Sequence, residues 1–514
     1  MRPDTLLRNT VLLIALLFAV ACTTVDFDYP KSESYAIRDT SDTDIGRAFA
    51  EIVAAHPADQ SGFYPVFNGI DSLALRLLLA ERAERSIDAQ YFLIHNDLVG
   101  VAFIDALLRA ADRGVRVRLL VDDIQLGGHD AGLAAIDAHE NVELRIFNPF
   151  KHRKLRALDV TRFSRVTRRM HNKSFTVDNQ IALIGGRNIA DEYFDANKGE
   201  RFGDLDVLTI GSIVPKVSAM FDTFWNHPAS VPVPAFAEAS PDAAEALANL
   251  GGLIAERLQD VEASEYADAV KSSVLHYVQS DASAFTWAKY DLVFDSPDKS
   301  NPDAAADADS IVVQMREAIG EVENELFVIT PYFVLTKDAI AGFRQLRQRG
   351  VDMTVLTNSL ASNNHSISHS GYAPARRELL EMGIKLYELR ANTNIPADES
   401  QGVQEAKRTL HAKAFVVDRK RVFIGSFNWN QRSVNLDTEL GVIMHAPGLA
   451  AEIVDRVIAA LPQQAFEVFL DDDGDLRWKG LDNGEPVIVA HEPQTSAWHR
   501  FTAGFLRIAP NSQL

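Results

Sequence analysis

The chain contains the same arrangement of reactive side chains twice, 240 residues apart. In each copy a histidine is followed, two positions later, by a lysine and, seven positions later, by an aspartate. The residues are His171, Lys173 and Asp178 in the first copy, and His411, Lys413 and Asp418 in the second. Two such matches arise by chance in about one in a thousand chains of this length. Paired histidines and lysines are suited to cutting or exchanging a phosphodiester.

Phosphodiester chemistry gives the two histidines different tasks. A neutral imidazole can attack phosphorus and form a phosphohistidine. A protonated imidazole can protonate the leaving oxygen and then serve as base for the incoming alcohol or water. Lys173 and Lys413 would place positive charge beside the phosphoryl oxygens. An asparagine follows each histidine at one fixed distance, at Asn188 and at Asn428, and can donate to the same oxygens.

The aspartates have a different expected role. The segments HNKSFTVD and HAKAFVVD alternate as β-strands do, so histidine and lysine point to one face. Asp178 and Asp418 end these strands just before a second apolar strand, where aspartate favours a turn. We count them among the six candidate catalytic residues and expect them to organise a hairpin rather than to react.

The elements before the two motifs follow the same order. In the first half, helices are expected at 71–85, 100–113 and 132–139, and strands at 86–94, 115–123 and 142–148. In the second half, helices are expected at 310–324, 337–349 and 375–382, and strands at 325–334, 351–358 and 384–389. This alternation predicts an α/β fold of two duplicated αβα sandwich domains, with helices on both faces of each sheet. A pseudo-twofold relation would bring both motifs into one active site at the interface.

Composition shifts suggest the boundaries of these parts. The expected parts are a signal peptide at 1–21, a tether at 22–60, the first half at 61–226, a linker with a helical insertion at 227–285, the second half at 286–460 and a C-terminal extension at 461–514. The end of the extension carries Trp498, Phe501 and Phe505. We expect this stretch to pack against the domain, with a membrane-surface helix as the alternative.

The N-terminus has the features of an export signal. Arg2 and Arg8 precede an apolar run at 11–21 that is too short to span a bilayer. The run ends at Cys22, which is the only cysteine in the chain. This segment resembles a bacterial lipoprotein signal, which implies lipidation of Cys22 and anchoring to a membrane. The following Thr23 implies the outer membrane of a Gram-negative bacterium, on its periplasmic side; an ordinary signal peptide with a spare thiol is the alternative.

The doubled motif resembles the phospholipase D superfamily over residues 60–460. In that family the second copy continues with Gly425, Ser426, Asn428 and an acid that orients the catalytic histidine, which corresponds to Glu439. The resemblance implies that Ser426 joins the two asparagines in binding the substrate phosphate. The first copy departs from the pattern because Gly186 replaces the serine and Gly199 stands at the acid position.

Two acids could replace the missing one in the first copy. Glu200 is adjacent to the expected position, and the sequence DLD at 204–206 resembles DTE at 437–439. We therefore expect Asp206 to be the counterpart of Glu439. Family analogy further implies that His171 is the nucleophile and His411 the acid. We expect no metal or other cofactor, because the remaining histidines lack metal-ligand spacing.

Within this superfamily, MHNKSFTVDNQIALIGGRNIADEYF and GSFNWNQRSVNLDTELG look like bacterial cardiolipin synthases, particularly the C type. That resemblance implies transfer of a phosphatidyl group to phosphatidylglycerol, from a second phosphatidylglycerol or from phosphatidylethanolamine, at a membrane surface. Between Arg145 and Arg169, nine lysines and arginines face a single acid, Asp159. We expect this segment to form a positive lip for anionic headgroups.

Three other functions remain open. A hydrolase releasing phosphatidic acid would use the same residues, with water as acceptor. A nuclease would share the catalytic core, but the net charge of −20 disfavours nucleic acid as a partner. A lipid-binding protein with a relic site would not need two intact motifs.

Overall fold

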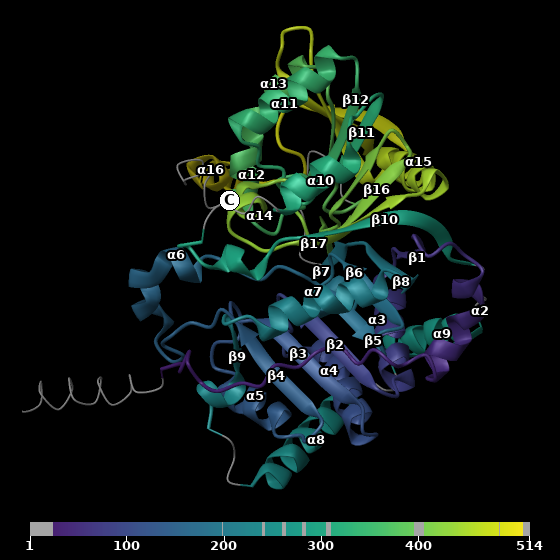
Figure 1. Ribbon diagram of the computed structural model, residues 1–514. Coiled ribbons are helices and arrows are strands. Elements are labelled where there is room, and N and C mark those ends of the chain that lie inside the picture. Colours follow the sequence, from purple (N-terminus) through teal and green to yellow (C-terminus); the bar gives the residue numbers. More distant parts are fainter. Residues whose placement is uncertain are drawn as a thin grey trace, which may run out of the picture.

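The computed structural model describes residues 24–197, 199–238, 242–259, 264–279, 284–304, 310–394, 406–482 and 484–506. The signal segment and Cys22 therefore lie outside the described residues. Two halves of similar construction lie one above the other, with the first half in purple to teal and the second in green to yellow (Figure 1). Each half has a sheet with helices packed against it, as the alternating pattern predicts.

In the first half, the sheet runs in the order β1-β8-β6-β5-β2-β3-β4-β9. Its strands are β1 (Gln60–Val66), β2 (Ser86–Tyr91), β3 (Arg116–Asp122), β4 (Val142–Phe147), β5 (Ser174–Val177), β6 (Ile181–Gly185), β8 (Asp206–Gly211) and β9 (Ser230–Pro232). The helices are α3 (Gly69–Arg82), α4 (Leu98–Asp112), α5 (Asp130–Asp137) and α7 (Val214–Asn226). Strands β2, β3 and β4 are parallel, and each pair is joined by a helix, α4 or α5.

The second half repeats this order as β10-β17-β16-β15-β11-β12-β13-β18. Its strands are β10 (Thr286–Phe294), β11 (Glu325–Ile329), β12 (Asp352–Asn358), β13 (Lys385–Leu389), β15 (Ala414–Val417), β16 (Arg421–Gly425), β17 (Leu440–His445) and β18 (Ala465–Leu470). The helices are α10 (Ile311–Ile319), α11 (Lys337–Gln348), α12 (Ser366–Tyr372), α13 (Arg376–Glu381), α14 (Gln431–Asn435) and α15 (Pro447–Gln464). The predicted duplicated α/β fold is confirmed.

Two strand pairings join the halves. Strand β1 pairs antiparallel with β10, from Gln60 opposite Lys289 to Phe63 opposite Thr286, so both sheets are continuous. Strand β7 (Glu200–Gly203) pairs in parallel with β14 (Lys407–Leu410) from the other half. Helices α7 and α15 share one buried hydrophobic cluster drawn from both halves. The halves therefore form one packed body, which fixes the motif strands relative to each other.

Residues 24–54 pack against the first half, and the prediction of a free tether at 22–60 is wrong for this part. The Lys31 ammonium donates to the carbonyl oxygens of His227 and Ser230, the latter at 2.7 Å. Arg118 donates to the Ser34 carbonyl at 2.8 Å. Helix α2 (Asp44–Ala54) follows. The polar composition of this segment therefore does not prevent packing, because its polar groups form hydrogen bonds with groups of the first half.

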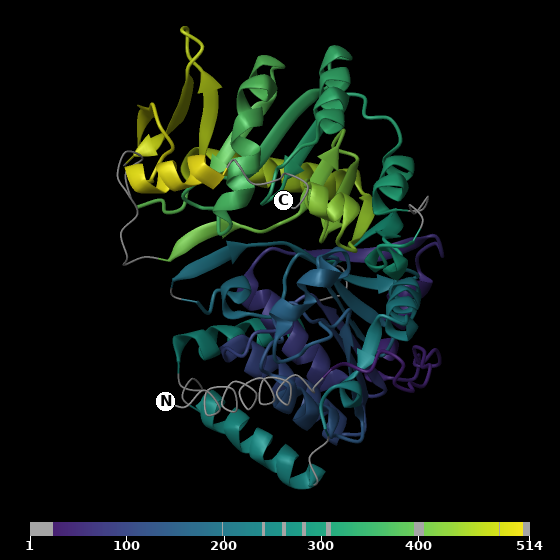
Figure 2. The ribbon, with the colours of Figure 1, turned by 90° about the vertical axis from the view of Figure 1, so that its left-hand side faces the viewer.

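The remaining elements extend each half. Helices α8 (Ala243–Gln259) and α9 (Glu265–Gln279) lie on the first half, against α4 and α5 and against α3, respectively. Strands β19 (Leu476–Asp482) and β20 (Glu485–Val489) with helix α16 (Ala497–Leu506) lie at the outer edge of the second half, in yellow in Figure 2. Among the described residues, no helix combines the length and the apolar character that a membrane crossing requires.

Candidate active site

The two motif histidines enter the site through backbone contacts between the halves. The His171 amide donates to the Thr438 carbonyl at 2.9 Å. The His411 amide donates to the Gly203 carbonyl at 2.8 Å. His411 thus follows strand β14, and His171 follows Met170, which forms a single bridge with Thr438, just before the motif strands β15 and β5. The same backbone register makes Thr438 and Gly203 structural counterparts.

Each histidine contacts one carboxylate from the opposite half. His171 Nδ1 lies 2.9 Å from Glu439 Oε2, and His411 Nδ1 lies 2.6 Å from Asp204 Oδ2. Both carboxylates are fully buried. Because a buried carboxylate engages Nδ1 in each ring, Nε2 is the nitrogen available to a phosphate; at His411 it also lies 3.0 Å from Lys413 Nζ.

The acid that contacts His411 is Asp204, and the prediction of Asp206 is wrong. Asp206 accepts from Arg76 Nη2 at 3.0 Å and from Ser72 Oγ at 2.6 Å, inside the first half. It lies on β8 opposite Gly185, which gives it a structural ion pair rather than a contact with His411. In DLD the first aspartate, not the last, follows the residue that pairs with the motif histidine.

Glycine at position 186 matches the shorter acid. A Cβ at Gly186 would lie 2.2 Å from Asp204 Oδ1, so a serine cannot fit beside this carboxylate. In the other half the hydroxyl of Ser426 donates to Glu439 Oε2, and Ser433 Oγ donates to Oε1 at 2.5 Å. The Ser426 hydroxyl is therefore bound to the acid, which corrects its expected place among the phosphate-binding groups.

The motif lysines are buried beside their histidines. Lys173 Nζ donates to the His171 carbonyl at 2.6 Å. Lys413 Nζ lies 2.7 Å from His411 Nδ1 and 3.0 Å from Nε2. Burial lowers the pKa of Lys173 well below its ordinary value and that of Lys413 to about 8. The site still carries positive charge at neutral pH, on Lys413 in particular.

The surroundings keep both imidazoles neutral in the free protein. Burial, followed by the charge of the adjacent motif lysine, lowers the pKa of His171 well below its usual value. The same causes lower the pKa of His411 to about 3. Each histidine also experiences the charge of the other motif's lysine, which shows that both motifs share one electrostatic site.

The two acids differ in charge state. Burial alone would raise the pKa of Asp204, but His411 and Lys413 outweigh it and hold this pKa below its ordinary value. Burial raises the pKa of Glu439 to about 7, against the opposing charge of Lys173. Asp204 is therefore a permanent anion beside His411, whereas Glu439 titrates near neutral pH beside His171.

The two asparagines occupy matching positions at the strand ends. Asn188 and Asn428 are buried, and among the described residues neither Oδ1 atom has a hydrogen-bond partner. Asn188 Nδ2 donates to the hydroxyl of Tyr193 at 3.0 Å. Aromatic rings complete the walls, with Phe92 5.0 Å from the His171 ring and Phe202 stacked on His411 at 5.3 Å.

Asp178 and Asp418 stand away from the reacting groups, in the hairpin turns. Asp178 accepts from the backbone amides of residues 84–86, and Asp418 accepts from those of residues 323–325. Both aspartates have a positive φ, of 50° and 53°. Their expected role as organisers fits these contacts.

The basic segment at 145–169 does not form the expected open positive lip. Arg145 and Arg153 are buried, with Arg145 bound to the Trp225 carbonyl and Arg153 paired with Asp130. The remaining arginines bind internal groups, except Arg162, which is exposed, as is Lys154. Guanidinium groups are common in such internal roles because their donors satisfy several acceptors at once.

Potential metal ligands lie outside this site. Among the described residues, His95, Asp97 and Glu192 form one group whose ligand atoms lie within 4.8 Å of one another. Asp97 caps helix α4 through Gly100, and His95 contacts Gln125 at 2.6 Å. These groups already have partners, and none of them contacts a motif histidine.

A cleft of about 990 Å³ lies between the halves behind the strands that carry His411 and its acid. Asp204, Leu410 and Ala412 form part of its wall. Arg408 and Arg456 also line it. The site thus adjoins a space with both apolar and cationic walls.

Comparisons with known proteins agree with this geometry. The family model described as "Cardiolipin synthase, PLD-like domain" matches residues 78–223 and 315–460. Cardiolipin synthase C of Escherichia coli (strain K12) is 36% identical over 91% of this chain and 98% of its own length. An uncharacterized protein of Helicobacter pylori (strain ATCC 700392 / 26695) is 28% identical over 98% of this chain and 99% of its own length.

A solved structure supports the fold assignment. The phosphatidylserine synthase of Haemophilus influenzae Rd KW20 is similar with a TM-score of 0.54 and 13% identity, over 84% of this chain and 92% of that one. The doubled motif, the shared site and the two family matches agree in their positions. This chain belongs to the cardiolipin synthase family of phospholipase D-like proteins.

Proposed function

We propose that this protein is a membrane-associated phosphatidyl transferase that makes cardiolipin from phosphatidylglycerol and a second phospholipid. The observation that supports this best is the pair of histidines, each bound to a buried acid from the opposite half. Two such imidazoles are what a two-step exchange through phosphohistidine requires. The second phospholipid is phosphatidylglycerol or phosphatidylethanolamine.

The first step forms the covalent intermediate. His171 Nε2 attacks phosphorus, the bond from phosphorus to the headgroup oxygen breaks, and His411 gives its proton to that oxygen. In the second step the terminal hydroxyl of phosphatidylglycerol attacks phosphorus and His411 takes the hydroxyl proton. The phosphorus–nitrogen bond then breaks, which frees His171 and completes cardiolipin.

The difference between the two acids supports these roles. Asp204 remains an anion and stabilises an imidazolium at His411, once the negative charge of the substrate phosphate also raises the His411 pKa. Lys413, whose Nζ lies within 3.0 Å of the ring, is a source for that proton. At His171 the neutral ring is the form that attacks, and burial keeps it neutral.

The asparagines and lysines would hold the phosphoryl oxygens. If the hydroxyl of Tyr193 donates to Asn188 Oδ1, the amide NH₂ turns toward the site and the unpaired oxygen gains a partner. The motif lysines, together with the His411 imidazolium when Lys413 has passed its proton to it, keep positive charge in a site with little water, where such charge stabilises the transition state strongly.

Membrane association would have two supports besides the substrate. Lipidation of Cys22 would anchor the protein to the periplasmic side of the outer membrane. Helix α16 packs against α12 as expected, but the side chains of Trp498, Phe501 and Phe505 on it are exposed rather than buried in the core. Helix α6 (Phe163–Val166) and the preceding turn also expose apolar residues, and α6 and α16 both lie toward the left in Figure 1.

Purified protein with labelled phosphatidylglycerol vesicles, without added metal, tests the activity. We expect labelled cardiolipin and glycerol. If phosphatidic acid is the sole product, the protein is a hydrolase rather than a transferase. With phosphatidyl-p-nitrophenol, whose leaving group needs no proton, His171→Ala should abolish a covalent phosphoenzyme, whereas His411→Ala should let it accumulate; the reverse pattern would exchange the two roles.

The anchor has a separate test. Cells expressing the Cys22→Ala variant are labelled with a fatty acid, and outer-membrane fractions are compared with those of the unchanged protein. We expect loss of the acyl label and of outer-membrane recovery. Undiminished labelling would exclude Cys22 as the lipidated residue.

A further inference from the structure

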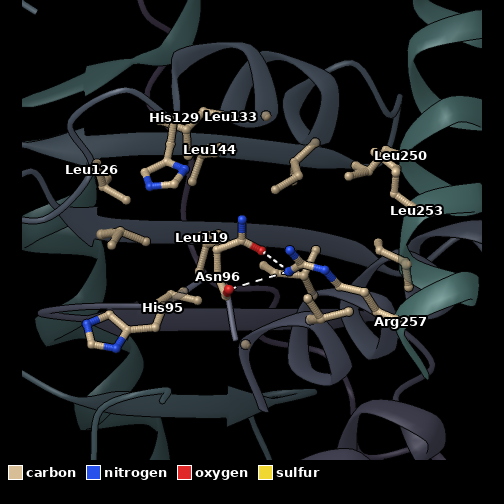
Figure 3. Close-up of a pocket in the computed structure, with 18 residues that line it drawn as sticks. His95, Asn96, Leu119, Leu126, His129, Leu133, Leu144, Leu250, Leu253 and Arg257 are labelled. Atoms are coloured by element: carbon tan, nitrogen blue, oxygen red, sulfur yellow. Dashed lines mark hydrogen bonds between the residues drawn. The ribbon is translucent and has the colours of Figure 1, made fainter. Parts of the chain in front are cut away.

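A second cavity, of about 320 Å³, lies in the first half between the sheet and helix α8 (Figure 3). Its floor is formed by Leu119 and Leu144 on β3 and β4, with Leu133 on α5. Leu250 and Leu253 on α8 close the opposite side. Most other lining side chains are aliphatic, and aromatic side chains other than two histidines do not line it within the described residues.

The chain leaves this apolar space open. Protein interiors are packed about as densely as organic crystals, and an apolar void of this size is costly to leave empty. In α8, Ile254 is buried, whereas Leu253 is 62% exposed although it lines the cavity. An exposed leucine at the edge of an apolar cavity is expected where a helix covers a bound ligand rather than where it closes a packed core.

Polar groups occur only at the rim. Arg257 on α8 donates to Asn96 Oδ1 at 2.5 Å. His95 and His129 line the cavity on the side away from Arg257, to the left in Figure 3. An aliphatic interior with one cation at its mouth matches an amphiphile that has an unbranched tail and an anionic head.

The cavity and the surroundings of His171 share one chain segment. Phe92 contacts the ring of His171, and Ile94 and Asn96 on the same segment line the cavity. Only Leu93 separates Phe92 from Ile94, so one short segment contributes to both the wall of the active site and the wall of the cavity. A lipid held here would therefore contact a segment that also contacts the ring of His171.

We propose that this cavity binds one acyl chain, with its anionic group at Arg257. The chain comes either from the phospholipid undergoing reaction or from a free fatty acid. The first source rests on the proposed transferase function, whereas acyl binding itself does not. The volume lies at the lower end of small-ligand sites, which fits a single chain.

Binding of cis-parinaric acid, a fluorescent fatty acid, tests the proposal on the full-length protein. Two variants block the cavity at its opening. Leu253→Gln places an amide at an already exposed position, and Gly132→Phe adds a ring where a Cβ would meet no atom within 4 Å. Ile458→Gln and Gly342→Phe are matched controls on helices α15 and α11 of the other half.

We expect both cavity variants to weaken binding at least tenfold and both controls to bind as the unchanged protein does. Arg257→Gln should weaken binding of the acid but not of its methyl ester. Equal affinity in all variants, or no saturable binding by the unchanged protein, would overturn the proposal. His171→Ala should bind the probe as the unchanged protein does. A loss of catalysis can therefore be distinguished from a loss of acyl-chain binding.

The source of the chain follows from the transfer assay. If the reacting lipid enters, phosphatidylglycerol displaces the probe, and Leu253→Gln raises KM for long-chain but not for dihexanoyl phosphatidylglycerol. If a free fatty acid enters, probe binding leaves KM unchanged and phosphatidylglycerol does not displace the probe. Both results support an acyl site. Displacement of the probe by a second copy of the protein, and by neither lipid, would contradict it.

Discussion

Replacement of Asp204 by asparagine should slow the reaction in a way that depends on the leaving group. The carboxylate lies 2.6 Å from His411 Nδ1 and is fully buried. Asparagine has a similar shape and no charge, so it removes the stabilisation of the imidazolium while it keeps the ring in place. An ordinary headgroup needs the proton of that imidazolium, so its departure should slow.

The size of the loss follows from the buried charge pair. At an effective dielectric constant of 20, two unit charges 4 Å apart interact by about 4 kcal/mol. Each 1.36 kcal/mol changes a rate about tenfold, so we expect a loss of about a thousandfold. General acid catalysis contributes about a hundredfold to ten-thousandfold, which agrees.

Pre-steady-state release of the headgroup measures the first chemical step alone. With phosphatidylglycerol the burst rate of Asp204→Asn should fall by about a thousandfold. With phosphatidyl-p-nitrophenol it should fall less than about tenfold, because nitrophenolate departs without a proton.

Glu439→Gln is the matched control, because it acts on the nucleophile and should slow both substrates alike. Equal losses for Asp204→Asn on the two substrates would refute the assignment of His411 as acid. Far-UV circular dichroism and thermal unfolding would verify that both variants are folded.

Three further predictions concern pH and stability. The value of kcat/KM should decrease at pH below about 7, because Glu439 becomes protonated and no longer accepts the His171 proton. It should also decrease at pH above about 8, because Lys413 loses its charge. The decrease on the acidic side should be absent in Glu439→Gln. Asp206→Asn should lower the free energy of unfolding in urea by about 3–5 kcal/mol, because it leaves buried Arg76 without its carboxylate, and an unchanged midpoint would contradict the structural role. Asp418→Ala should lower the free energy of unfolding by about 1–3 kcal/mol, because it leaves the backbone amides of residues 324 and 325 without an acceptor. A loss of activity without a loss of stability would instead indicate a catalytic role for Asp418.

Local pattern was sufficient for the central elements of each half. Strand β3 was expected at 115–123 and occurs at Arg116–Asp122, and helix α11 was expected at 337–349 and occurs at Lys337–Gln348. Such elements are long and strongly periodic, so side-chain alternation determines them. The strands that join the halves, β1 with β10 and β7 with β14, were not foreseen, because their pairing partners lie more than 200 residues away.

The same limit explains the error at Asp206. Sequence similarity aligned DLD with DTE from the last residue backwards, which pairs Asp206 with Glu439. The backbone contacts instead pair Gly203 with His411 and Thr438 with His171, and these contacts move the alignment by two positions to Asp204. Strand pairing between distant segments is a property of the assembled sheet, and a one-sequence pattern does not contain it.

The departure at Gly186 from the family pattern is explained as a compensated change. Aspartate reaches less far than glutamate, so a carboxylate at position 204 must lie closer to the strand end, where a Cβ would collide with it at 2.2 Å. Removing the serine also removes a hydroxyl that would donate to the acid, and Asp204 instead contacts His411 and lies in the field of the Lys413 charge. At Glu439 the hydroxyls of two serines donate to the carboxylate, and burial raises the pKa of this carboxyl group. One change in acid length thus produces two unlike imidazole environments, which a reaction with separate nucleophile and acid needs and a symmetric duplicate would lack.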